Sequence, residues 1–69
     1  MKVDDIKVAL KRSDGAHRSV VRALEDDRMV IFKGSLLLVE QEGGETAVYL
    51  LRRYTVDPGD LYMYRFEKA

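Results

Sequence analysis

The segment 31–66 constrains the fold of this chain most, because two turn-forming sequences divide it into three apolar runs. The first turn sequence is Glu-Gly-Gly-Glu at 42–45, and the second is Asp-Pro-Gly-Asp at 57–60. Glycine adopts the positive φ of tight hairpin turns without steric cost, and Pro-Gly is typical of type I or II turns. The segment therefore predicts three antiparallel strands joined by two hairpins.

Each hairpin predicts a strand register. A two-residue loop at 43–44 pairs Val39 with Val48, Leu37 with Leu50, Ser35 with Arg52 and Lys33 with Tyr54. A wider loop over 57–60 pairs Val56 with Leu61, Tyr54 with Met63, Arg52 with Arg65 and Leu51 with Phe66.

Side chains alternate between the two faces of a strand, so this register divides the segment into two faces. The predicted core face carries Phe32, Leu36, Leu38, Tyr49, Leu51, Tyr62, Tyr64 and Phe66, interrupted by Arg53 and Thr55. The opposite face carries the apolar residues Ile31, Leu37, Val39, Val48, Leu50, Val56, Leu61 and Met63, together with Lys33, Ser35, Arg52, Tyr54, Arg65 and Glu67. Because both faces are apolar, we expect each to be covered.

The first 28 residues fit two interpretations. Residues 6–11 alternate in polarity, 12–15 read as a turn, and 17–24 read as a return strand, which predicts a mainly β fold. This antiparallel meander would have five to six strands and tend to a barrel or sandwich. In the alternative, an α+β fold, one or two N-terminal helices pack on a three-stranded antiparallel sheet.

The helical alternative places a helix over 14–27, capped by Asp14, because His17, Val20, Val21 and Leu24 fall at helical spacing. Two adjacent β-branched valines and three acids at its C-terminal end oppose that helix, so we predict strands. Gly34 predicts either a bulge in one bent strand or a turn between two short strands.

Length and charge predict a single small domain over residues 1–69. Twelve basic and twelve acidic residues balance, so no net charge attracts the chain to nucleic acid or to a membrane. The chain has no cysteine, which excludes disulfides and cysteine zinc sites. It also shows neither an apolar run of about 18–20 residues nor a signal-peptide pattern, so we expect a cytoplasmic protein without a membrane segment.

Catalytic and metal-binding patterns find no support in the residues. His17 is the single histidine, which is too few for a zinc site without cysteine. The acids Glu25, Asp26 and Asp27 lack the spacing of an EF-hand loop, and neither a nucleophile-elbow nor a nucleotide-binding glycine pattern occurs. We therefore expect a non-enzymatic protein without a cofactor or metal.

The mixed sheet face is the expected site of function. We predict an interaction module that self-associates or binds a protein partner through Leu37, Val39, Val48 and Leu50. The alternative is nucleic-acid or anion binding by Lys33, Arg52, Tyr54 and Arg65, with Tyr54 stacking on a base. Arg52 and Arg65 face each other in the predicted register, so a counter-charge is needed, which Glu67 or an external anion could supply.

Overall fold

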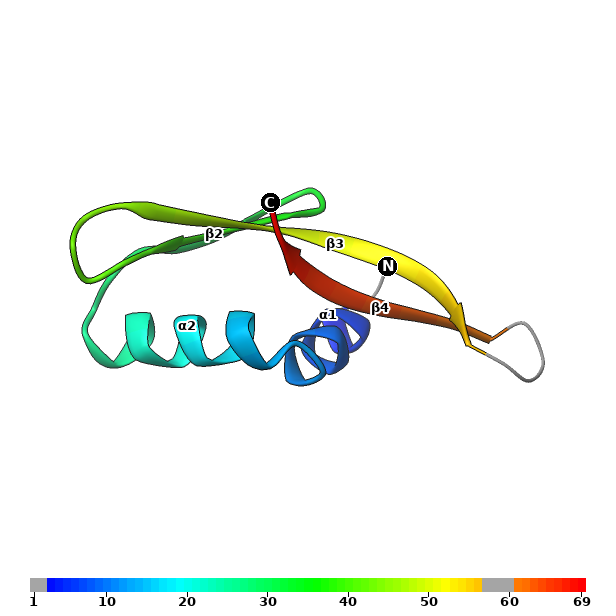
Figure 1. Cartoon of the computed structure of the whole chain (residues 1–69). Coiled ribbons are helices and arrows are strands. Elements are labelled where there is room, and N and C mark those ends of the chain that lie inside the picture. The colour runs from blue at the N-terminus through cyan, green and yellow to red at the C-terminus, as the bar shows by residue number, and fades with distance from the viewer. Residues whose placement is uncertain (1–2, 57–60) are drawn as a thin grey trace.

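Two helices pack on one face of a four-stranded antiparallel sheet in the computed structural model, which describes residues 3–56 and 61–69 (Figure 1). The side chains of 3–5, 54, 56, 61 and 62 lie outside this description. The elements are α1 (Val3–Lys11), α2 (Asp14–Glu25), β1 (Val30–Lys33), β2 (Leu36–Glu40), β3 (Thr46–Val56) and β4 (Leu61–Lys68). The strands follow one another across the sheet in the order β1-β2-β3-β4.

The predicted strands over 6–11 and 17–24 are wrong, because both segments are helical. The five-to-six-stranded meander is thus not confirmed, and the α+β alternative fits, with one more strand than its three. On α2, Ala16, Val20 and Ala23 are buried at helical spacing, whereas Val21 is 39% exposed. The two adjacent valines therefore point to different sides, and burial of one helical face outweighs their preference for strands.

Helix α2 ends in a turn that stabilises its C-terminus, although the three acids there were expected to disfavour a helix. Asp27 has φ of 55°, and the backbone N–H groups of Asp27 and Arg28 donate to Leu24 O and Ala23 O. These two bonds form a Schellman motif, which satisfies carbonyl groups that the helix end would otherwise leave unpaired. The Arg28 guanidinium also bonds the Asp26 carboxylate at 2.9 Å, so a cation offsets one of the acids.

The predicted β3–β4 register is confirmed, including the Arg52–Arg65 and Leu51–Phe66 pairs. The turn residues 57–60 that led to it lie outside the described residues. The predicted β2–β3 register is wrong by one residue, because Leu37 pairs with Tyr49 and Val39 with Ala47.

The β2–β3 loop explains this shift. Gln41 N–H donates to Glu45 O at 2.7 Å, Gly44 N–H donates to Gln41 O at 2.9 Å, and Gly44 has φ of +88°. The loop thus has three residues, 42–44, of which the last is left-handed, as in a type I turn followed by a bulge. A one-residue shift moves every side chain of a strand to the other face.

As a result, β2 buries different leucines from those predicted. Leu37 and Val39 are fully buried against the helices, whereas Leu36 and Leu38 face away from them. The prediction for β3 and β4 is confirmed at the core positions Tyr49, Leu51, Tyr64 and Phe66, which are buried or packed against buried residues. The Tyr62 side chain lies outside the described residues.

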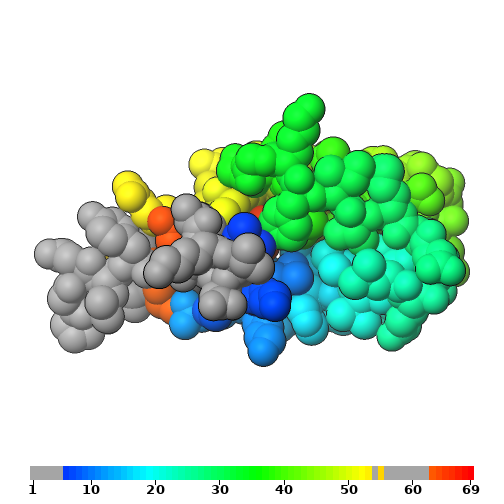
Figure 2. Space-filling model, turned by 180° about the vertical axis from the view of Figure 1, so that it is seen from behind, coloured from blue at the N-terminus to red at the C-terminus, as the bar shows by residue number. Residues whose placement is uncertain are grey.

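Strand β1 forms one edge of the sheet, above α2 in the view from behind (Figure 2). Lys33 pairs with Leu36, so Gly34, at φ of +61°, and Ser35 make a two-residue turn. Of the two predictions for Gly34, the turn between short strands is therefore confirmed. The Phe32 ring meets the Phe66 ring edge-on at 5.4 Å, although Phe32 stays 43% exposed.

The buried core is small. Among the described residues, nine hydrophobic ones are buried, and four of these are alanines: Ala9, Ala16, Ala23 and Ala47. The largest side chains that are fully buried belong to Leu37 and Val39. No helix in the described part of the chain is long and apolar enough to cross a membrane.

Candidate functional site

The sheet face turned away from the helices, here called the outer face, carries a continuous group of aliphatic side chains. Strand pairing places Ile31, Leu38 and Val48 in one row across three strands, and Leu36 and Leu50 in the next row. We call these five residues the apolar strip. All are at least partly exposed, and no described element covers them, because both helices lie on the opposite face (Figure 1).

The apolar strip contains only half of the residues predicted for the interface. Val48 and Leu50 belong to it, as expected. Leu37 and Val39 do not, because each is 0% exposed in the core. Their predicted place on the mixed face is therefore wrong, and the cause is the one-residue shift between β2 and β3. Leu36 and Leu38 occupy the outer-face positions instead.

The basic residues predicted to bind an anion are spread across the sheet. Arg52 and Arg65 are cross-strand neighbours, and Arg52 Nε lies 3.5 Å from Glu67 Oε2. Both side chains of this ion pair are more than half exposed, so the pair stabilises the fold little. Lys33 pairs with Leu36 and not with Tyr54, and three strand spacings, about 14 Å, separate β1 from β4. The Tyr54 side chain lies outside the described residues.

Further large hydrophobic side chains are exposed near the β1 edge. Large exposed hydrophobic residues occur on α2 (Val21, Leu24) and in the segment that enters and forms β1 (Met29, Ile31, Phe32). We call these five residues the β1-edge surface. Ile31 belongs to both surfaces, so an assembly contact at either one would reach this residue.

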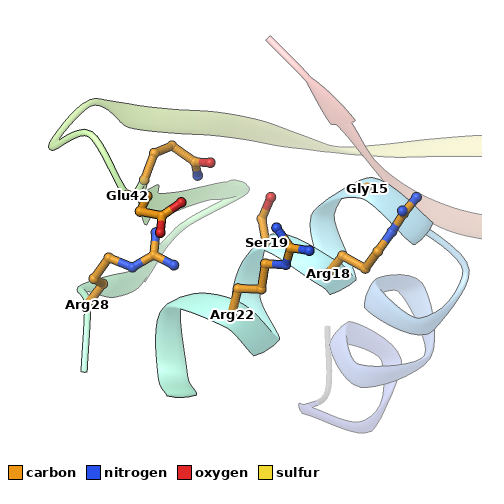
Figure 3. A pocket seen from close by; sticks show the side chains of 7 residues that line it. Gly15, Arg18, Ser19, Arg22, Arg28 and Glu42 are labelled. Atoms are coloured by element: carbon orange, nitrogen blue, oxygen red, sulfur yellow. The ribbon is translucent and has the colours of Figure 1, made fainter. Parts of the chain in front are cut away.

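A pocket of about 280 Å³ opens between α2 and the β2–β3 loop, on the helix side of the sheet (Figure 3). Its lining residues are Gly15, Arg18, Ser19, Arg22, Arg28, Gln41 and Glu42. Arg28 and Glu42 lie together at one end and Arg18 at the other, with Ser19 and Arg22 between (Figure 3). A second hollow shares Gly15, Ser19 and Gln41 and continues to Glu45, Thr46, Ala47, Tyr49 and Lys68.

The sequence interpretation missed this pocket. Arg18 and Arg22 are four residues apart, which is one helical turn, so the helical alternative places them on one side of α2. That spacing was the available signal. The loop that closes the pocket, however, comes from a distant part of the chain.

Hydrogen bonds fix one end of the pocket and connect α2 to the sheet. Arg28 Nη1 donates to Glu40 O, and Nη2 donates to Asp26 Oδ2, both at 2.9 Å. Arg28 Nε is buried and has no hydrogen-bond partner within the described structure. The hydroxyl groups of Ser19 and Tyr49 lie 3.0 Å apart and join α2 to β3. The Arg28 guanidinium is therefore fixed in place, whereas Arg18 and Arg22 are exposed.

Residues 3–56 and 61–69 contain no cluster of metal ligands. Within them, no three histidine or acidic side chains come close enough together to hold a metal ion. His17 lies half-buried on α2.

The described residues thus form an apolar strip on the outer face, further exposed apolar side chains near the β1 edge, and a pocket with an adjoining hollow beside α2. A scan against protein-family models, a search of curated proteins and a search of solved structures find no significant match to this chain.

Proposed function

We propose that this chain is a non-enzymatic interaction module that associates with a second copy of itself through the apolar strip. The observation that carries the proposal is the uncovered outer face. Ile31, Leu36, Leu38, Val48 and Leu50 lie side by side there with no described element over them. Contiguous apolar surface of this kind is typical of protein–protein contacts.

The small core supports assembly. A chain of 69 residues buries a smaller fraction of its surface than a larger domain does, and alanines supply much of the buried set. Short chains with small cores often gain stability from oligomerisation. Two copies stacked on this face would bury the apolar strip. The pair would then have four layers, helix, sheet, sheet and helix, in place of the two layers of a single copy.

The charges at the ends of the strip favour a second copy as the occupant. Glu40 lies on the outer face beyond one end of the strip, and Arg52 lies beyond the other. When two copies stack face to face with their strands antiparallel, Glu40 of one approaches Arg52 of the other. This two-fold arrangement pairs opposite charges at both rims and leaves the aliphatic residues at the centre.

The test is the native mass of two matched variants, measured by size-exclusion chromatography with light scattering. Val48→Asp places a charge in the centre of the strip and should convert the assembly to monomers. Val21→Asp makes the same substitution on the β1-edge surface and should leave the mass unchanged. Circular dichroism at the same concentration should show the helical content of both variants preserved.

Three outcomes would contradict the proposal. The first is a wild-type chain that stays monomeric at high concentration. The second is an assembly that Val21→Asp dissociates and Val48→Asp does not, which would assign the contact to the β1-edge surface. The third is a Val48→Asp chain that keeps both the helical content and the native mass of the wild type.

The alternative of nucleic-acid binding rests on the Arg52–Arg65 pair. Glu67 already provides a carboxylate 3.5 Å from Arg52, and Lys33 lies on a distant strand, so this alternative has less support. It would be favoured over self-association if labelled single-stranded RNA bound at low salt and the double variant Arg52→Ala, Arg65→Ala abolished that binding.

A further inference from the structure

Positive charge exceeds negative charge among the residues that line the pocket beside α2. Three arginines and one glutamate line it, which gives an excess of two positive charges among its lining residues. Arg18 and Arg22 lie one helical turn apart on α2, and like charges at this spacing destabilise a helix by a few tenths of a kcal/mol. Within the described structure, neither guanidinium forms an ion pair or a hydrogen bond. A bound anion would remove this repulsion.

The third arginine differs from the other two because it is fixed. Arg28 bonds Glu40 O and the Asp26 carboxylate, each at 2.9 Å, and its side chain is 15% exposed. Its Nε–H group is a buried donor without a partner in the described structure. Arg28 therefore forms a rigid wall at one end of the pocket, with its charge offset by Asp26, and the more exposed Arg18 and Arg22 supply the unpaired positive charge.

Neutral groups in the pocket suit an oxyanion as well. Ser19 offers a hydroxyl between the arginines (Figure 3). Gly15 lies in the first turn of α2, and no atom other than those of its chain neighbours and its own helix backbone lies within 4 Å of the place where its Cβ would be. The backbone at the positive end of the helix dipole is thus open to a ligand at this point, which adds to the charge of the arginines.

We propose that this pocket binds the phosphate group of a small phosphate monoester. Guanidinium groups bond phosphate oxygens in pairs, and the two guanidinium groups of Arg18 and Arg22 match the two charges of a phosphate dianion. The organic part of the ligand would extend into the adjoining hollow, which Ala47 and Tyr49 line together with polar residues. Arg18 and Arg22 are the direct phosphate ligands, and Arg28 closes one end.

The test is a titration of the wild-type chain with phenyl phosphate and with inorganic phosphate, followed by amide chemical shifts in NMR. The amide signals of Gly15, Ser19 and Gln41 should shift and saturate. The double variant Arg18→Gln, Arg22→Gln should bind phenyl phosphate at least about tenfold more weakly. The matched control Lys11→Gln, Arg12→Gln removes the same charge from the exposed end of α1 and should change affinity less than about twofold.

Substitution of Glu42 should change the affinity for phenyl phosphate in the opposite direction. Its carboxylate lines the same pocket and repels an anion, so Glu42→Gln should tighten phenyl phosphate binding roughly two- to fivefold. Glu25→Gln, at the exposed end of α2, removes the same charge outside the pocket and should have no effect. A single-stranded oligonucleotide, whose internal phosphates are diesters, should not compete with phenyl phosphate at equal phosphate concentration.

Several results would overturn this proposal. They are a lack of saturable shifts up to about 10 mM phenyl phosphate, equal weakening by both double variants, and competition by the oligonucleotide. A lack of saturable shifts would show that the pocket does not bind phosphate. Equal weakening by both double variants would show that binding depends only on net charge. Competition by the oligonucleotide would assign the pocket to nucleic acid. Because none of these variants touches the outer face, the native mass should stay that of the wild type in all of them.

Discussion

Ser13 joins three elements through one hydroxyl group. Its Oγ donates to Ala9 O at 2.7 Å in the last turn of α1 and accepts from Phe66 N–H at 2.8 Å in β4. Its backbone carbonyl accepts the His17 N–H as α2 begins, and the residue is 5% exposed. Because β4 is an edge strand, Phe66 N–H has no partner strand on that side, and Ser13 takes that place.

Ser13→Ala should destabilise the chain by about 1–3 kcal/mol, because a buried backbone donor and a buried acceptor both lose their partner. Urea denaturation followed by circular dichroism measures the change. Ser35→Ala, at an exposed turn position, should change stability by less than about 0.5 kcal/mol and serves as the matched control. Equal stability of the two variants would mean that the hydrogen bonds of the Ser13 hydroxyl do not stabilise the fold.

The sequence around Ser13 predicts a hairpin turn over 12–15, but the chain has only a short break there, between α1 and α2. Ser-Asp-Gly is common both in hairpin loops and at the start of helices, so local chemistry alone does not separate the two. The deciding partner, Phe66, lies 53 residues away. The arginines of the pocket were missed for the same reason, because Arg18 and Arg22 meet Gln41 only when the chain is folded.

The β2–β3 loop decides which face of β2 is buried. A Gly-Gly pair suits a two-residue loop with positive φ at both positions, and it also suits a three-residue loop that ends in one left-handed residue. The chain adopts the second, with positive φ at Gly44 and not at Gly43. The β3–β4 register was predictable because a four-residue loop around Pro-Gly left one pairing, whereas Gly-Gly left two.

Substituting alanine at each glycine of this loop should separate the two loop types. Gly44→Ala forces an L-residue to φ near +88° and should cost about 1–2 kcal/mol in unfolding free energy. Gly43→Ala meets no atom within 4 Å and has no positive φ, so it should be neutral or stabilise by up to about 1 kcal/mol. Thermal unfolding compares the two, and equal losses would indicate the two-residue loop instead.

At the scale of the whole molecule, the outer face includes positions that were predicted correctly from the sequence and others that were not. The sequence correctly indicated that the sheet has two apolar faces, and it placed Val48 and Leu50 on the outer one. It placed Leu37 and Val39 there too, because a single wrong loop length shifted all of β2. The N-terminal third was wrongly predicted to form strands, because its valines fit the periods of both a strand and a helix. The burial of Ala16, Val20 and Ala23 on one side favours the helix.

If the apolar strip is covered by a second copy, the stability of the chain must depend on its concentration, because folding and association are then linked. The midpoint of thermal unfolding should rise by about 3–6 °C for each tenfold increase in protein concentration, as expected for a dimer of chains this short. Differential scanning calorimetry over two decades of concentration measures this slope. Val48→Asp should remove the slope and lower the midpoint, whereas Val21→Asp should keep it. A wild-type midpoint independent of concentration would instead mean that the small core, with its four alanines, suffices to fold the chain alone.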